Sequence, residues 1–211
     1  MRRATLEGAP VFEVTKLELE ALTQGAVHQG VAMEIAAYDY ADALELLDRV
    51  SATGRKPLFV ALDQVTDPHN LGAVLRSAGA FGADGVIIPQ RRSADVNATV
   101  WKVSAGAAAR VPVAKETNLV RTLEAFKARG CFVVGLDGNG SVSVDNLNLA
   151  DQPLVLVTGA EGKGLSRLVS QTCDEIASIN IRAAVESLNA AVATGIALYE
   201  VDRVRRTTQG N

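Results

Sequence analysis

Apolar residues along this chain follow two alternating patterns from residue 58 onward. Short apolar runs rich in β-branched residues, bounded by turn residues, predict buried strands. Apolar residues spaced three and four apart between them predict amphipathic helices. The expected strands are 58–62, 85–89, 111–114, 131–136, 154–158 and 175–179. The expected helices are 71–81, 96–106, 118–129, 165–172 and 188–205. This alternation predicts an α/β fold, a largely parallel sheet with helices on both faces.

The first 40 residues have a different pattern and contain too little apolar sequence for an independent core. We expect short strands at 10–14 and 31–36 and a helix at 15–23, in which Thr15 is the N-cap and Glu18 completes a capping box. A second helix is expected at 41–50. The segment Ser51–Pro57 has the composition of a linker. We therefore predict a partial small N-terminal α/β domain at 1–50 and a larger domain at 58–211.

Composition limits the class of protein. The chain is 48% hydrophobic, 21% charged and 4% aromatic, typical of a globular α/β protein. It has no apolar run near the ~20 residues that span a bilayer and no signal peptide after Met1, so we expect a cytoplasmic protein away from membranes. Cys131 and Cys173 lack a CxxC spacing and predict buried, reduced thiols. Neither His28 nor His69 lies in a cluster of residues with metal-ligand spacing, so no metal is expected.

The net charge of −3 argues against a generally basic nucleic-acid binder. Residues 1–57 hold six Lys and Arg against nine Asp and Glu, whereas residues 58–211 hold fifteen of each. RNA binding would therefore depend on local patches. The candidates are Arg91-Arg92 and the group Arg203, Arg205 and Arg206, although such clusters are more commonly solvated surface.

The stretch 154–166, LVLVTGAEGKGLS, carries the first candidate chemistry. Its buried strand delivers Glu161 into a glycine-rich turn, where the backbone can approach a ligand closely. It is not a phosphate-binding P-loop, because Lys163 is followed by Gly164 rather than Ser or Thr. Taken alone, it is equally compatible with a simple strand-to-helix connection. A second glycine-rich stretch, GLDGNG at 135–140, lacks the dinucleotide fingerprint and predicts a plain loop.

The stretch 62–82 places Asp67-Pro68 at the end of a strand and Asn70 at a plausible N-cap. Arg76 follows one and a half turns later. A purely structural role would make Asn70 a cap and Arg76 a surface residue. That interpretation leaves the glycines at 72, 79 and 82 unexplained, since glycine weakens an exposed helix. They indicate tight packing or the close approach of another chain.

The stretch 176–196 runs from a strand through a loop to Ser187-Leu188-Asn189, which open the last helix. Ser187 could be a simple N-cap. The free N–H groups at such a helix end also suit polar ligand atoms.

Together these stretches resemble the three signature motifs of the SpoU (TrmH-like) RNA 2′-O-ribose methyltransferases of the SPOUT superfamily. The matching segments are 67–82, 158–166 and 187–189, in the family's order, and the resemblance covers about residues 58–205. The segment Gly25–Ile35 is similar to the end of the small RNA-binding domain of the RlmB-like branch.

The resemblance implies a SPOUT-type α/β knot with a C-terminal trefoil knot, S-adenosylmethionine bound in that knot, and a homodimer with both active sites at the interface. It implies cofactor contacts at Gly159, Ile179 and Leu188. The residues that match the family's catalytic and substrate-positioning set are Asn70, Arg76, Glu161, Ser187 and Asn189.

These residue types suit methyl transfer to a ribose hydroxyl. Arg76 is a poor base because its guanidinium stays protonated. We expect it to bind the substrate phosphate and to stabilise the developing alkoxide. Asn70, Asn189 and Ser187 can orient Arg76 or the ribose, and we expect Glu161 to orient its neighbours rather than to act as the base.

One segment departs from the family pattern. The family has I-P-M-x-G before its SLN element, whereas Ile179-Asn180-Ile181-Arg182-Ala183 stands here. Losing the proline frees a fixed φ, and losing the glycine removes access to positive φ. The expected consequence is an altered adenosine pocket or a weaker cofactor affinity.

The leading hypothesis is an S-adenosylmethionine-dependent RNA 2′-O-ribose methyltransferase acting on guanosine in large-subunit (23S) rRNA. The alternatives are a tRNA 2′-O-methyltransferase and a catalytically weak RNA-binding or ribosome-assembly factor with the same fold. A nucleotide-binding oxidoreductase is disfavoured, since the dinucleotide fingerprint is missing.

Overall fold

The computed structural model describes residues 10–182 and 187–209, and the chain divides into two compact units, Met1–Ala37 and Tyr38–Asn211. The described part of the first unit holds one helix, α2 (Lys16–Leu22). The Thr15 hydroxyl accepts a hydrogen bond from the Glu18 amide, and the Glu18 carboxylate accepts one from the Thr15 amide. The predicted capping box is therefore confirmed.

The strands predicted at 10–14 and 31–36 are wrong. Neither segment pairs with another in the described part of the unit. An extended segment becomes a strand only when a neighbour takes its backbone hydrogen bonds, so apolar content alone misled the prediction. Their larger apolar side chains are exposed, Phe12 and Met33 at 79% each.

The boundary between the units falls earlier than the linker Ser51–Pro57 suggests. Helix α3 (Ala43–Ser51), capped by the Asp42 carboxylate, buries Ala43, Leu46 and Leu47 in the core of the larger unit. Just before it, the Ala41 amide donates to the Val113 carbonyl at the edge of the sheet. The apolar face of α3 thus ties residues from Tyr38 onward to the second unit.

The larger unit is built on a seven-stranded sheet with the order β3-β2-β1-β6-β4-β7-β5, in which every pairing is parallel. The strands are β1 (Leu58–Asp63), β2 (Gly85–Pro89), β3 (Val113–Glu116), β4 (Phe132–Leu136), β5 (Val142–Ser143), β6 (Leu154–Gly159) and β7 (Glu175–Ser178). This confirms the predicted parallel α/β sheet. β6 enters late in the sequence but lies between β1 and β4.

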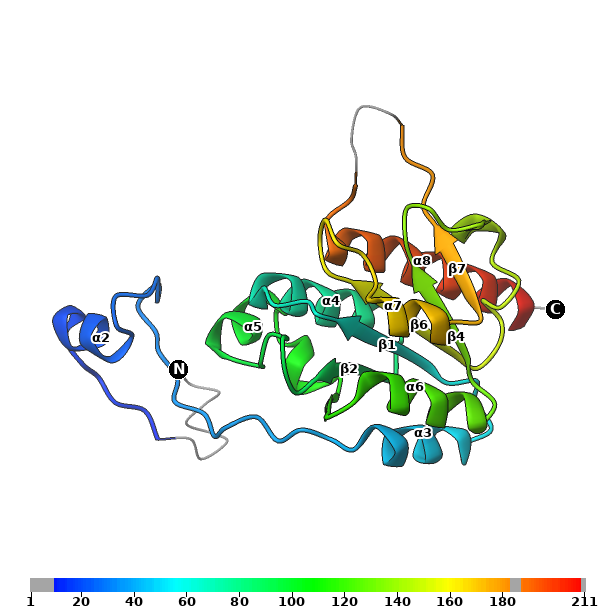
Figure 1. Ribbon diagram of the computed structural model, residues 1–211. Coiled ribbons are helices and arrows are strands. Elements are labelled where there is room, and N and C mark those ends of the chain that lie inside the picture. Colours follow the sequence, from blue (N-terminus) through cyan, green and yellow to red (C-terminus); the bar gives the residue numbers. More distant parts are fainter. Residues whose placement is uncertain (1–9, 183–186, 210–211) are drawn as a thin grey trace. The chain divides into compact units, whose positions relative to one another are not determined.

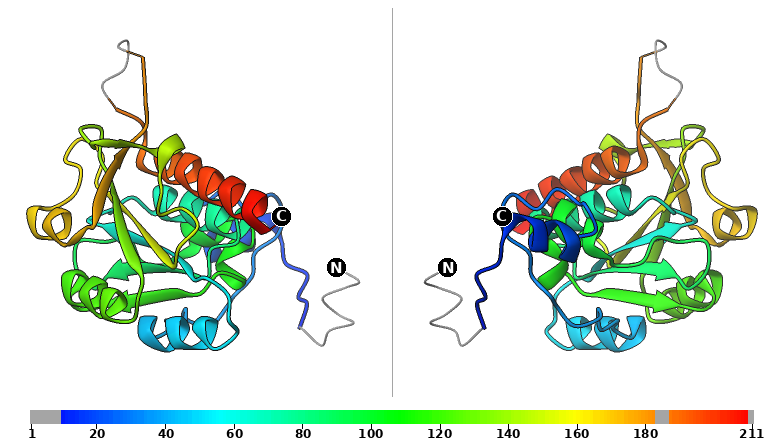
Figure 2. Two further views of the ribbon diagram at one scale, coloured as in Figure 1. Left: turned by 90° about the vertical axis from the view of Figure 1, so that its right-hand side faces the viewer. Right: turned by 90° about the vertical axis from the view of Figure 1, so that its left-hand side faces the viewer.

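Helices cover both faces of this sheet (Figures 1 and 2). One face packs against α4 (Pro68–Ala80), α5 (Ala98–Val103), the 3-10 turns η1 (Ala107–Ala109) and η2 (Val144–Asn146), and α8 (Ala190–Gln209). The other face packs against α3, α6 (Leu119–Ala128) and α7 (Arg167–Thr172). Alternate residues of β1 serve the two cores: Val60 belongs to the first and Phe59 to the second.

Helix α4 begins earlier than predicted. The Asp67 carboxylate caps it by accepting from the His69 amide, which lowers the pKa of that carboxyl, and Pro68 occupies the first turn. Asn70 therefore lies inside the helix. The glycine at 72 is explained by packing, because a Cβ there would lie 2.7 Å from the Cβ of Val103 on α5.

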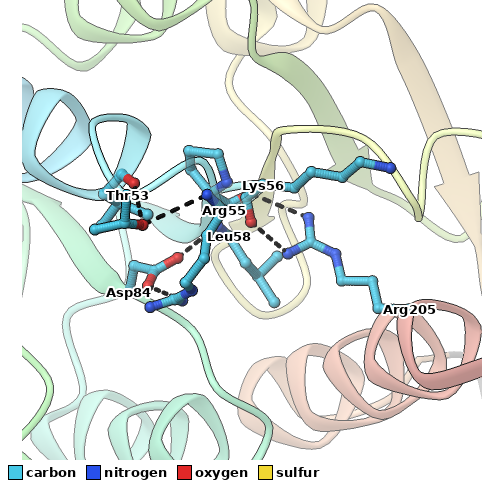
Figure 3. Close-up of polar contacts among 8 residues, drawn as sticks. Thr53, Arg55, Lys56, Leu58, Asp84 and Arg205 are labelled. Atoms are coloured by element: carbon cyan, nitrogen blue, oxygen red, sulfur yellow. Dashed lines mark hydrogen bonds and ion pairs between the residues drawn. The ribbon is translucent and has the colours of Figure 1, made fainter. Parts of the chain in front are cut away.

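Arg205 fixes the C-terminal part of α8 to the body of the unit (Figure 3). Its guanidinium donates to the carbonyls of Lys56 (2.9 Å) and Pro57 (3.0 Å) before β1, and to those of Ala150 (3.1 Å) and Gln152 (2.6 Å) before β6. Arg205 thus holds the last helix against the start of two central strands. Across the described residues, we find no helix with the length and apolar character that a membrane crossing requires.

Candidate active site

A pocket of about 500 Å³ lies at the carboxyl edge of the sheet, where β4, β6 and β7 end. Ligands of open α/β sheets bind at this edge. The pocket's walls come from three segments brought together by the strand order: residues 136–139 after β4, the glycine-rich turn 158–164 after β6, and the described residues between 177 and 193 around the start of α8. Predicted cofactor residues Gly159, Ile179 and Leu188 all line it.

The turn after β6 is compact because glycine is required at several places. The amides of Lys163 and Gly164 both donate to the Ala160 carbonyl, at 3.3 and 2.9 Å. A Cβ on Gly159 would lie 2.2 Å from the Gly164 backbone, and Gly164 itself has φ +65°. The folded-back turn therefore brings bare backbone to the pocket and projects Glu161 at its rim.

A polar network joins three of the predicted catalytic residues. The side-chain amide of Asn70 donates a hydrogen bond to Glu161 Oε1 at 3.3 Å. The side-chain amide of Asn189 donates to the same oxygen and also, at 2.8 Å, to Asn70 Oδ1. The backbone amide of Ala190 adds a further bond to Glu161 Oε1 at 3.2 Å. Glu161 is thus fixed at the N-terminus of α8, where the helix dipole favours a negative charge. Asn70 is only 7% exposed, so its position is set by the core.

The start of α8 is capped by Asn189, not by Ser187. Asn189 Oδ1 accepts from the amides of Ala191 (2.9 Å) and Val192 (3.2 Å). The N-cap role considered for Ser187 is therefore wrong, because the helix begins two residues beyond the position that role requires. Ser187 is exposed and lines the pocket.

Arg76 does not join the network. It is exposed on α4, and no other described residue forms a hydrogen bond or ion pair with its side chain. It lies six positions after Asn70, which places it about 120° around the helix and about 9 Å along the axis. The guanidinium can therefore bind a group that does not belong to the Asn70–Glu161–Asn189 network.

The atypical segment before the SLN element is anchored in another way. Ile179 and Ile181 line the pocket, and between them the Asn180 amide donates to the Ser143 hydroxyl on β5 at 3.1 Å. Ser143 in turn donates to the Asp145 carboxylate. At the position where the family has a proline with a fixed φ, Asn180 instead forms a side-chain hydrogen bond to the edge strand of the sheet. Ala183 lies outside the described residues.

The sequence profile of the SpoU rRNA Methylase family matches residues 57–199. The chain belongs to this family. A second profile, for the substrate-binding domain of RNA 2′-O ribose methyltransferases, matches residues 1–41.

Relatives and solved structures agree with this membership. An uncharacterized tRNA/rRNA methyltransferase of Mycobacterium ulcerans (strain Agy99) is 52% identical over 206 residues, covering 97% of this chain. The chain spans 66% of that relative's length. The AdoMet-bound rRNA methyltransferase from Sinorhizobium meliloti aligns with a TM-score of 0.75 and 27% identity, covering 96% of this chain and 75% of that one. The SpoU methyltransferase AviRb from Streptomyces viridochromogenes, in complex with AdoMet, aligns with a TM-score of 0.73 and 28% identity. This alignment covers 93% of this chain and 80% of AviRb.

One part of this SpoU pocket was missed by sequence reasoning. The stretch 135–140, predicted as a plain loop, contributes Asp137, Gly138 and Asn139 to the wall. The available signal was topological: β4 pairs directly with β6, so the loop after β4 begins beside the glycine-rich turn after β6. That pairing is not visible in the local pattern.

The two arginine groups considered for RNA binding differ in the folded SpoU chain. Arg203 pairs with Glu200, Arg206 pairs with Asp202, and Arg205 holds the backbone carbonyls described above. Arg91 and Arg92 are exposed after β2, at the same edge of the sheet as the pocket. No three His, Cys, Asp or Glu side chains gather into a metal-binding group in the described ranges.

Proposed function

We propose that this SpoU chain is an S-adenosylmethionine-dependent RNA 2′-O-ribose methyltransferase that acts on guanosine in large-subunit (23S) rRNA. The observation that carries the proposal is the Asn70–Glu161–Asn189 network at the rim of the glycine-lined pocket. It holds fixed polar groups where a substrate would meet a bound methyl donor, and such preorganisation is a main source of catalysis.

The pocket's residues fit S-adenosylmethionine. Its volume of about 500 Å³ suits a nucleoside-sized ligand. Leu136, Ala177, Ile179 and Leu188 supply an apolar wall for adenine, and the bare backbone at Gly159 permits close approach. We assign cofactor contacts to Gly159, Ile179 and Leu188. When bound, S-adenosylmethionine supplies an electrophilic methyl group on a cationic sulfur.

The chain's own residues then position the ribose. The 2′-hydroxyl that would receive the methyl group must lose its proton, which would pass to solvent water at the open rim of the pocket, while the electron pair of the carbon–sulfur bond would stay with sulfur. Glu161 is committed through Oε1 to three donors, so we assign it to orientation. Asn70 and Asn189 hold it there, and we assign Ser187, which lines the pocket, to the substrate.

Arg76 is assigned to the substrate phosphate and to the developing alkoxide. Its guanidinium has no partner among the other described residues and a fork geometry that suits phosphate oxygens. Because it lies about 9 Å from Asn70 along α4, we assign it to an RNA that reaches over the helix surface or to the site of a second copy.

We propose a homodimer that covers the outer face of α8. Val192, Ile196 and Tyr199 lie at helical spacing and are 51%, 40% and 49% exposed, forming an apolar stripe. The Tyr199 ring packs against Phe81 at the end of α4, with ring centroids 5.8 Å apart. A second copy on this stripe would lie along the helix pair that presents Arg76. Light scattering should give a dimer mass for wild type and a monomer mass for Ile196→Glu; equal masses would contradict the interface.

RNA recognition is assigned to the N-terminal segment and to Arg91 and Arg92. The profile match at 1–41 supports the first assignment, and the position of two exposed cations after β2, at the same edge of the sheet as the pocket, supports the second. The rRNA choice follows from the resemblance to the RlmB-like branch, and a tRNA substrate is the nearest alternative.

The test is direct. Purified protein with radiolabelled S-adenosylmethionine is offered ribosomal RNA and tRNA from cells that lack the gene, and the modified ribose is mapped by resistance to alkaline hydrolysis. Methylation of a 23S rRNA guanosine is expected. Labelling of tRNA alone would replace the substrate, and absence of both cofactor binding and labelling would overturn the proposal.

A non-catalytic RNA-binding role is the second candidate. It is favoured by the departure at 179–183, where Asn180 and Ile181 replace proline and methionine and Ile181 lines the pocket. Calorimetric titration with S-adenosylmethionine separates the two candidates, because micromolar binding is expected only of the enzyme.

A further inference from the structure

Asp137 follows β4 and is held rigidly at the wall of the pocket. Its amide donates to the Ala177 carbonyl on β7 at 3.0 Å, and its carbonyl accepts from the Gly140 amide at 3.0 Å. Its Oδ1 accepts from the Asn139 amide at 2.9 Å. Backbone and one carboxylate oxygen are therefore fixed by the protein, which leaves the second oxygen in a defined place.

That second oxygen lies close against the glycine-rich turn at the pocket wall. A Cβ on Gly164 would lie 2.7 Å from Asp137 Oδ2, so the carboxylate stands directly opposite a position that only glycine leaves open. Oδ2 forms no hydrogen bond or ion pair with any other residue in the described part of the chain. Asp137 is half-buried and lines the pocket, so an acceptor with spare capacity lies at a partly desolvated wall.

We propose that Asp137 Oδ2 accepts a hydrogen bond from a ribose hydroxyl of S-adenosylmethionine, and so makes Asp137 a cofactor-binding residue. This rests on the proposed function. Asp137 adjoins Leu136 and Ala177 of the apolar wall that suits adenine, and ribose is the group attached to adenine. An aspartate beside a glycine-rich turn is a known solution for ribose hydroxyls in nucleotide sites. We assign one hydroxyl to Oδ2, because Oδ1 already accepts from the Asn139 amide.

The alternative ligand group is the cofactor's ammonium, and the alternative role is purely structural. Asp137→Asn separates these possibilities, because its side-chain oxygen can still accept from the Asn139 amide while an NH2 group replaces Oδ2. Asp39→Asn is the matched control, since it makes the same chemical change at an exposed carboxylate.

Calorimetric titration would use S-adenosylhomocysteine, 5′-methylthioadenosine, which keeps the ribose but lacks the amino acid, and the 2′-deoxy and 3′-deoxy forms of S-adenosylhomocysteine. For Asp137→Asn we expect the affinity for both parent ligands to fall about ten- to a hundredfold. The Asp39→Asn protein should bind like wild type. The ligand that lacks the contacted hydroxyl should bind wild type and Asp137→Asn equally. Thermal melting of the ligand-free proteins should be unchanged.

Three results would overturn the inference. Retained affinity for 5′-methylthioadenosine with a loss for S-adenosylhomocysteine would assign the contact to the ammonium. Unchanged affinity for both, or a fall in melting temperature that accounts for the loss, would leave Asp137 a loop residue only. If wild type binds none of the ligands, the proposed function itself is wrong. That outcome is distinct from the three above, in which wild type binds.

Discussion

The side chain of Asn189 donates a hydrogen bond of 2.8 Å to Asn70 Oδ1, joining two residues that lie 119 positions apart in the sequence. One belongs to the first turn of α4 and the other caps α8. Because both also donate to Glu161 Oε1, the three motifs share one polar centre. Each motif thereby depends on the other two for its geometry.

Replacing Asn70 by Ala should disable transfer without removing the cofactor. The change removes one donor to Glu161 and the acceptor for Asn189, so the carboxylate and the start of α8 lose their mutual orientation. We expect the methylation rate to fall about 10- to 100-fold, a size typical of lost positioning. The dissociation constant for S-adenosylhomocysteine should change little, because Asn70 does not line the pocket.

The matched control is Asn118→Ala, which removes another asparagine that bonds a helix start, here α6. It should cost about 1 kcal/mol of stability and leave the rate unchanged. Equal losses of activity in both variants would attribute the effect of Asn70 to folding.

Arg76→Ala should abolish methyl transfer while cofactor affinity stays near that of wild type. Arg76→Lys should recover little, since a lysine keeps the charge but lacks the planar fork that binds two phosphate oxygens. Arg121→Ala, at an exposed arginine of α6, serves as the control and should retain activity. Single-turnover rates and calorimetry measure the two quantities separately. A collapse of cofactor affinity in Arg76→Ala would show that its assigned role is wrong.

Asp63 should support the glycine-rich turn from the neighbouring strand. It is 5% exposed at the end of β1, and its Oδ2 accepts from the Ser166 amide at 2.6 Å. Asp63→Ala leaves that amide without its partner, which costs about 1–3 kcal/mol. Asp63→Asn retains an acceptor and should recover most of the stability. Urea unfolding measures both, and equal destabilisation by the two variants would show that the charge matters instead.

The sequence-based prediction succeeded where the signal was local. The apolar runs of β1 and β6 identified buried central strands, and Thr15 with Glu18 identified a capping box. It failed where the local structure depends on a neighbouring segment or residue. The segments 10–14 and 31–36 have strand composition but pair with no other segment among the described residues. Asn70 has the composition of a cap, yet Asp67 takes that position because Pro68 fits the first turn after it.

The candidate site shows the same division. Composition identified Glu161 and Asn189 as polar residues beside glycine or a helix start, but their meeting with Asn70 depends on β6 entering between β1 and β4. The same strand order brings Asp137 to the pocket, and no local pattern encodes it. The C-terminal trefoil knot stays a prediction.

Arg205 should contribute more to stability than its neighbours in the arginine group. It donates to four backbone carbonyls, and no single replacement can satisfy them all. Arg205→Ala should lower the free energy of unfolding by on the order of 3 kcal/mol, and Arg205→Lys should recover only part of it. Arg203→Ala, at an exposed residue paired with Glu200, should change stability little. Similar melting curves for the two alanine variants would contradict this role.

Alkaline pH should destabilise the protein through its two thiols. Burial raises the pKa of Cys131 to about 11, and burial together with the Asp174 charge raises the pKa of Cys173 to about 11, from an ordinary value of 9.0. Between these values the unfolded chain releases thiol protons that the folded chain retains, so stability is complete below about pH 9 and falls as the pH rises toward about 11. Urea midpoints at pH 8 and pH 10 measure this fall. The double variant Cys131→Ala/Cys173→Ala should show a smaller drop between the two pH values, even if it is less stable at both, and an unchanged drop would assign the alkaline loss to other groups.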